Sequence, residues 1–179
     1  MLRKVLVLVL LIGISAITAT AQKVKVGADP KADFTKYKTY AWDKGSPAAN
    51  PIINQMIIDA IDSALAGKGL TKVTSNPDVT VVAWAALGAD LRIANPGWWH
   101  GAGSAASTGM DIGEQRWSIS KGTLVVDISD GGTKESVWRG SAVSTLPSGP
   151  TGDMAQDAKD ARKNVLKSVE KMFKHYPKP

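Results

Sequence analysis

Residues 122–143 read GTLVVDISDGGTKESVWRGSAV, and they predict a β-hairpin. Between residues 124 and 128 one set of apolar side chains alternates with Val125 and Asp127, which is the period of a strand with two different faces. The segment Asp130-Gly131-Gly132-Thr133 has the composition of a tight turn, and residues 137–143 supply the returning strand. The hairpin register depends on loop length, so the residue opposite Trp138 stays open.

Two helices are predicted, one before and one after this hairpin in the sequence. The first begins at Asn50-Pro51, a good cap followed by a proline at the first helical position, and ends at Gly67. The second runs from about residue 153 to 174, and its lysines fall opposite a narrow apolar stripe that starts at Met154. The lysine face is typical of a solvated surface, with contact to an anionic surface as the alternative. Each helix therefore has one apolar face to bury.

Further strands are predicted around residues 23–26, 39–42, 70–73, 79–86 and 115–120. The segment 79–86 is apolar nearly throughout, which indicates a central strand covered on both faces. Two one-sided helices need one sheet face to cover. The predicted fold class is therefore α+β, a two-layer sandwich of a mainly antiparallel sheet with two helices on one face.

The first 21 residues have the pattern of a secretory signal peptide. Arg3 and Lys4 precede an apolar run of about 13 residues, too short to cross a membrane, and Ala19-Thr20-Ala21 is an A-x-A cleavage site. We expect residues 1–21 to be removed and residues 22–179 to form a single α+β domain. That leaves 158 of 179 residues and no transmembrane span.

Composition excludes several functions. The chain has no cysteine, so it has no disulfide, no thiolate zinc site and no thiol after the signal to carry a lipid. It has two histidines, which excludes histidine-rich metal sites, and we expect neither a metal nor a cofactor. The formal charge of +6 falls to +4 when Arg3 and Lys4 are removed, too mild for a nucleic-acid partner.

A long irregular loop is predicted at about residues 88–114, and it holds Trp98-Trp99-His100. Adjacent exposed tryptophans can stack on a sugar ring, enter a partner's groove or lie at a lipid headgroup layer. The alternative, favoured by the burial of indole rings, is that Trp98 and Trp99 cover the second face of the sheet. His100 has no ligand-like spacing to Asp90 or Asp111, the carboxylates nearest to it in sequence.

No catalytic set emerges from the remaining residues. Asp127 and Arg139 are expected to form a structural ion pair across the hairpin, and Trp42 and Trp138 to act as packing residues. The serines lie in neither of the motifs that activate a serine nucleophile. We therefore expect that the protein is not an enzyme.

Three segments resemble a bacterial envelope family catalogued as domain of unknown function 4136. They are DFTKYKTYAW at 33–42, GTLVVD at 122–127 with VWRGSA at 137–142, and the final helix ending in Tyr176-Pro177. The resemblance spans about residues 24–177. It implies an exported protein of Gram-negative bacteria, many relatives being lipoproteins, and it supplies no activity and no catalytic residue. Because the lipid-bearing cysteine is missing, the chain departs from the lipoproteins, which favours a soluble periplasmic protein.

These observations favour an exported, non-enzymatic binding or structural module. Its location would be periplasmic or secreted, with or without association with the outer membrane, and its partner an envelope protein or a cell-wall component. The second hypothesis is a small-molecule or lipid carrier with a pocket between helices and sheet. A hydrolase that uses Asp127 or His100 is the third and weakest hypothesis.

Overall fold

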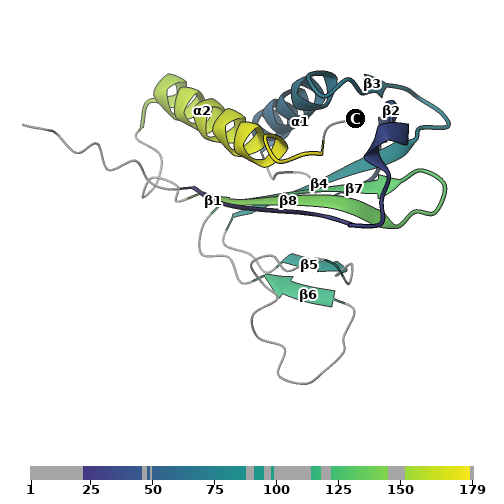
Figure 1. The fold of residues 1–179 in the computed structure, drawn as a ribbon. Coiled ribbons are helices and arrows are strands. Elements are labelled where there is room, and N and C mark those ends of the chain that lie inside the picture. The colour runs from purple at the N-terminus through teal and green to yellow at the C-terminus, as the bar shows by residue number, and fades with distance from the viewer. Residues whose placement is uncertain are drawn as a thin grey trace, which may run out of the picture.

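A six-stranded sheet with two helices over one of its faces forms the centre of the structure (Figure 1). The computed structural model describes residues 22–45, 48, 50–87, 91–94, 98, 114–117, 122–144 and 152–177. The elements follow the order β1 (Lys23–Ala28), the 3₁₀ helix η1 (Phe34–Lys36), β2 (Thr39–Trp42), α1 (Pro51–Ala66), β3 (Thr71–Lys72), β4 (Val79–Leu87), β5 (Leu91–Ala94), β6 (Glu114–Trp117), β7 (Gly122–Asp130), β8 (Ser136–Ser144) and α2 (Met154–Phe173). The predicted signal peptide, residues 1–21, lies outside the described residues.

The strand order in the large sheet is β1-β8-β7-β4-β2-β3. The pairs β1–β8, β8–β7 and β7–β4 are antiparallel, whereas β2 pairs in parallel with both β3 and β4. Helix α1 connects the parallel strands β2 and β3. The predicted α+β class, with a mostly antiparallel sheet and two helices, is confirmed.

Strands β7 and β8 form the predicted hairpin, and its register is now defined. Ile128 lies opposite Trp138 and Asp127 opposite Arg139, with an irregularity between Ile128 and Ser129. Asp130 holds the turn, because its Oδ1 accepts hydrogen bonds from the backbone N–H groups of Gly132 (2.8 Å) and Thr133 (2.9 Å). The hairpin also presents an apolar row to the helices: Leu124, Val126, Ile128, Trp138 and Ala142.

The helices begin where their capping residues predict. The Asn50 side chain accepts from the backbone N–H groups of Ile52 and Ile53, and Pro51 occupies the first turn of α1. Asp153 caps α2 in the same way. Among the described residues, no helix has the length and apolar content to cross a membrane.

The core lies between the helices and the sheet. Ile61 and Leu65 of α1 and Met172 of α2 are fully buried there, and burying one such side chain contributes about 1.5–3 kcal/mol. An aromatic cluster is part of this core. The centroid of the Trp138 ring lies 4.9 Å from that of the Phe173 ring and 5.4 Å from that of the Tyr176 ring. The space between helices and sheet is thus filled by side chains.

Two predictions about local structure are wrong, and a third, for residues 79–86, holds only in part. Strand β4 is central but not fully covered on both faces, since Val79 and Val81 are buried while Val82 and Trp84 are half-buried. The stretch 88–114, predicted to be irregular, contains β5 and the first residue of β6. The apolar stripe of α2 is buried only in its later turns, and Met154 is 87% exposed.

Candidate functional site

Trp98 is the one residue of the predicted Trp98-Trp99-His100 site that the structure describes; Trp99 and His100 lie outside the described residues. Its indole Nε1 donates a hydrogen bond of 3.0 Å to the backbone carbonyl of Ser136, the first residue of β8. The side chain is half-buried. Trp98 is therefore hydrogen-bonded to the sheet and still partly accessible. It has one feature of a residue that covers the sheet and one of a residue that can bind a partner, the two alternatives raised by the sequence.

An open cleft of about 860 Å³ borders the exposed part of Trp98. It runs beside β1, the strand at one edge of the sheet, and it also reaches the last turn of α2 and the residues just after it. The described residues that line it are Gln22, Val24, Lys25, Val26, Gly27, Ala28, Trp98, Lys171, Lys174 and His175. Segments from both ends of the chain thus meet at one surface.

The charge of this cleft is positive. Lys25 comes from β1, and Lys171 and Lys174 come from the end of α2; no aspartate or glutamate is among the described lining residues. A cation in the last helical turn is also favoured by the helix dipole. The sequence placed these two α2 lysines on a solvated face, because periodicity identifies the polar face of a helix but not the strand that passes beside it.

Asp127 and Arg139 form a buried polar pair on the sheet. Arg139 donates from Nη2 to Oδ2 of Asp127 at 2.7 Å and from Nε to Oδ1 at 3.2 Å. The hydroxyl of Ser136 donates to the same Oδ1 at 2.5 Å. Asp127 and Arg139 are only 6% and 2% exposed. Both carboxylate oxygens therefore accept hydrogen bonds from buried or half-buried groups of the protein.

Ser136 connects this pair to the cleft. Its backbone carbonyl accepts from Trp98, and its hydroxyl donates to Asp127. A residue that faces the cleft is therefore two hydrogen bonds away from the buried ion pair. The sequence predicted neither contact, because Ser136 shows no motif.

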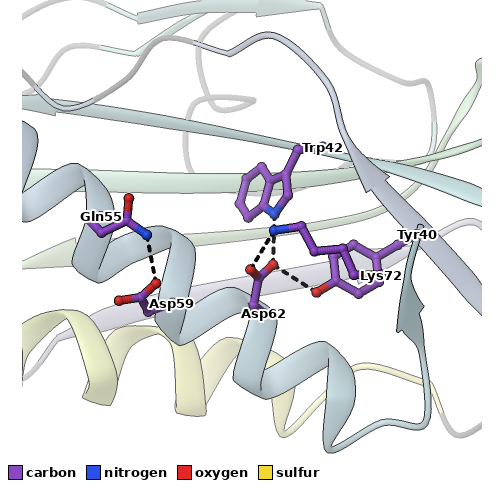
Figure 2. Close-up of polar contacts among 6 residues, drawn as sticks. All are labelled: Tyr40, Trp42, Gln55, Asp59, Asp62 and Lys72. Carbon is purple, nitrogen blue, oxygen red and sulfur yellow. Dashed lines mark hydrogen bonds and ion pairs between the residues drawn. The ribbon is translucent and has the colours of Figure 1, made fainter. Parts of the chain in front are cut away.

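A second polar cluster surrounds Asp62 of α1 (Figure 2). Its Oδ1 accepts from the Tyr40 hydroxyl and the Trp42 indole N–H, both at 2.8 Å, and its Oδ2 accepts from the Lys72 ammonium at 2.9 Å. Burial alone would raise the pKa of the Asp62 carboxyl, but the hydrogen bonds from Lys72, Trp42 and Tyr40 together lower it. Burial and the contact with Asp62 in turn raise the pKa of Tyr40.

The Asp62 cluster ties α1 to β2 and β3. Its three donors come from Tyr40, Trp42 and Lys72, and together they engage both oxygens of the Asp62 carboxylate. Gln55 and Asp59, on the same helix, form a separate exposed pair (Figure 2). The sequence placed Asp62 on the polar face of the helix, and Trp42, expected to pack, also donates the hydrogen bond to it. Among the described residues, no group of three or more acidic or histidine side chains could hold a metal ion.

Comparison with known proteins identifies the family. A family model described as a domain of unknown function, DUF4136, matches residues 24–178. The chain belongs to this family. A search of curated proteins found no match.

Several solved structures are similar to this DUF4136 protein at low identity. A PDZ domain protein from Parabacteroides distasonis is 15% identical, with a TM-score of 0.49; the match covers 88% of this chain and 37% of that one. The PelC dodecamer from Paraburkholderia phytofirmans is 12% identical, with a TM-score of 0.47 and coverage of 85% and 98%. A minor lipoprotein from Acinetobacter baumannii is 10% identical, with a TM-score of 0.41 and coverage of 77% and 91%. These likenesses are too distant to assign a role.

Proposed function

We propose that this protein is an exported, non-enzymatic module of the bacterial envelope that binds a partner in the cleft beside β1. The observation that carries the proposal is the meeting of three features at one surface: the partly exposed Trp98, the edge of β1, and the lysines at the end of α2. Tryptophan and cations are groups that proteins use to bind partners. The signal-peptide pattern of residues 1–21 supports the periplasm or the outer membrane as its location.

The local chemistry favours binding over catalysis. A general base must reach the proton that it abstracts, whereas Asp127 is buried and has both oxygens engaged by Arg139 and Ser136. Asp62 is likewise held by three protein donors. These contacts weigh against Asp127, one of the two residues named in the hydrolase hypothesis; the other, His100, lies outside the described residues.

The packing also disfavours a carrier with its ligand between helices and sheet. Trp138, Phe173 and Met172 fill that space, and each is at most 3% exposed. We expect native mass spectrometry of the protein, taken from its own periplasm, to give the mass of the chain alone. A bound lipid or small molecule in that spectrum would favour the carrier.

Site-specific photo-crosslinking in the source bacterium tests the proposed binding. Benzoylphenylalanine in place of Lys174 lies in the cleft, and the matched control replaces Lys163, an exposed residue of the same helix that is not among those lining it. We expect a discrete adduct at position 174, none at position 163, and loss of the adduct when Trp98→Ala is added. The proposal fails if both positions give the same pattern or if position 174 gives no adduct.

The proposed export has its own test. The intact mass of the protein recovered from the periplasm should correspond to a chain that begins at Gln22. A cytosolic product that retains residues 1–21 would refute it.

A further inference from the structure

Among the described residues, strand β1 has a partner strand along one edge and none along the other, which we call the open edge. The strand lies at the end of the strand order and pairs only with β8 among the described strands (Figure 1). The backbone N–H of Asp29, just after β1, donates to the carbonyl of Val137 at 2.8 Å. In antiparallel pairing every second residue turns its N–H and C=O toward the partner strand. Val24, Val26 and Ala28 therefore turn theirs away from β8.

The open edge faces the cleft. All residues from Val24 to Ala28 line it, with Trp98 and the end of α2 also bordering it. Five residues of extended chain span roughly 17 Å at 3.4 Å per residue. The volume of about 860 Å³ is in the range of pockets that hold a molecule of drug size. A short extended segment therefore fits the cleft in both length and volume.

We propose that β1 accepts an extended acidic peptide segment of a partner protein as an added strand of the sheet. This inference rests on the proposed function and specifies its partner. The outward N–H and C=O groups of Val24, Val26 and Ala28 supply the backbone hydrogen bonds, which is how exposed sheet edges bind peptides. Lys25, Lys171 and Lys174 select for acidic side chains on the added strand.

Charge argues against a second copy of this chain as the added strand. Two β1 strands side by side would bring Lys23 and Lys25 of each copy close together, and like charges opposite each other destabilise strand pairing. Lysines on an edge strand are a common means of preventing self-association. The same lysines attract carboxylates, so the edge discriminates between an acidic segment and a copy of itself.

Fluorescence anisotropy with a defined probe tests the pairing. The probe is a labelled seven-residue peptide of alternating glutamate and valine, titrated into the mature chain at low salt. Two control peptides are used: one with glutamine in place of glutamate, and one N-methylated at alternate residues so that one backbone edge cannot donate. We expect at least tenfold weaker binding for each control peptide. Equal binding of the N-methylated and unmodified peptides would overturn strand addition, as would no binding of the unmodified probe.

A matched pair of variants tests the same point on the protein. Val26→Pro removes an N–H that points away from β8, whereas Val26→Thr keeps it and preserves the β-branched shape. We expect at least tenfold weaker probe binding for Val26→Pro and little change for Val26→Thr, with both melting within a few degrees of the wild type. If Val26→Pro does not fold, strand addition is tested by comparing the binding of the N-methylated and unmodified peptides to the wild-type protein.

The outcomes separate this inference from the proposed function. Equal binding by Val26→Pro and Val26→Thr overturns strand addition, while an adduct at position 174 in the crosslinking experiment would still support the cleft as a binding site. Lys171→Gln with Lys174→Gln should weaken binding of the glutamate peptide and reduce its salt dependence, and an unchanged salt dependence contradicts the selection for acidic segments. A dimer of the mature chain that Val26→Pro disrupts would identify a second copy as the occupant and overturn the proposal.

Discussion

Asp127 on β7 and Arg139 on β8 lie directly opposite each other and are joined by two hydrogen bonds, of 2.7 and 3.2 Å. Both side chains are buried, so the two charges interact with little screening by solvent. A buried ion pair adds little net stability over an apolar pair, but removing one partner leaves a buried charge without compensation. The pair therefore makes the hairpin intolerant of change at either position.

Asp127→Asn should destabilise the fold strongly. The substitution removes the negative charge that lies 2.7 Å from the Arg139 guanidinium, and breaking a buried pair in this way costs about 3–5 kcal/mol. Urea unfolding gives the free energy of unfolding directly. Asp59→Asn is the matched control, because Asp59 is exposed on α1, and we expect a change within about 0.5 kcal/mol there. Similar small changes for both variants would contradict this role of the pair.

Asp62→Asn should lower stability in a pH-dependent manner. The hydrogen bonds from Lys72, Trp42 and Tyr40 outweigh burial and hold the pKa of the Asp62 carboxyl in the folded protein below its ordinary value, so folding favours the ionised form. Its contribution is fully present above about pH 4 and is lost as the pH falls through the lower, folded-state pKa. The difference in unfolding free energy between wild type and variant should therefore be larger at pH 6 than at pH 3.

Urea unfolding of both proteins at the two pH values measures that difference. Asp78 and Asp130 also have a lowered pKa, but they titrate in both proteins and cancel in the comparison. A difference that stays constant with pH would show that Asp62 contributes no titrating interaction.

Gly140→Ala should overpack the core. A Cβ at this position would lie 2.8 Å from Cη2 of Trp138 and 2.9 Å from Sδ of Met172, and overpacking typically costs about 1–3 kcal/mol. Gly132→Ala in the hairpin turn is the control, since its nearest contact would be an ordinary 3.4 Å to Asp130. In a double-mutant cycle with Met172→Ala, the two losses should sum to more than the loss in the double variant. Strict additivity would argue against the contact.

Asn50→Ala should weaken the start of α1. The Asn50 Oδ1 accepts hydrogen bonds from the backbone N–H groups of Ile52 and Ile53 in the first turn, at 2.8 and 3.3 Å. Loss of such a cap costs about 1 kcal/mol, and thermal or urea unfolding would measure it. Asn50→Asp keeps an acceptor and should stay near wild type, so an equal loss in both variants would speak against capping as the cause.

The sequence predicted the elements with strong periods and caps well. The hairpin at 122–143 alternates clearly, and α1 has a cap, a proline and a regular apolar face, so local patterns were sufficient there. Strand β5 (Leu91–Ala94) was missed because it has four residues, between segments that contain glycine and proline. Four residues are too few to show the alternation of polar and apolar side chains that is typical of a strand. The register at Trp138 needed the structure, because one residue of slip reverses the faces.

The sequence predicted less about which surfaces are covered. The apolar segment 79–86 indicated burial on both faces, but the doubly buried strand is β7, where Val125 and Val126 are both fully buried. Composition shows how apolar a strand is and not which layer lies on it. The Asp62 cluster and the lysines beside β1 were missed for the same reason: their partners come from distant parts of the chain.

The pairing of β1 with β8 also affects how the molecule forms. Lys23 lies opposite Val143, so the earliest strand to be synthesised finds its neighbour only when most of the chain exists. Closing so long a loop is entropically unfavourable, and contacts between distant segments slow folding. We therefore expect a newly made chain to stay unfolded longer than a chain whose neighbouring strands follow each other in sequence, which would suit the export proposed above.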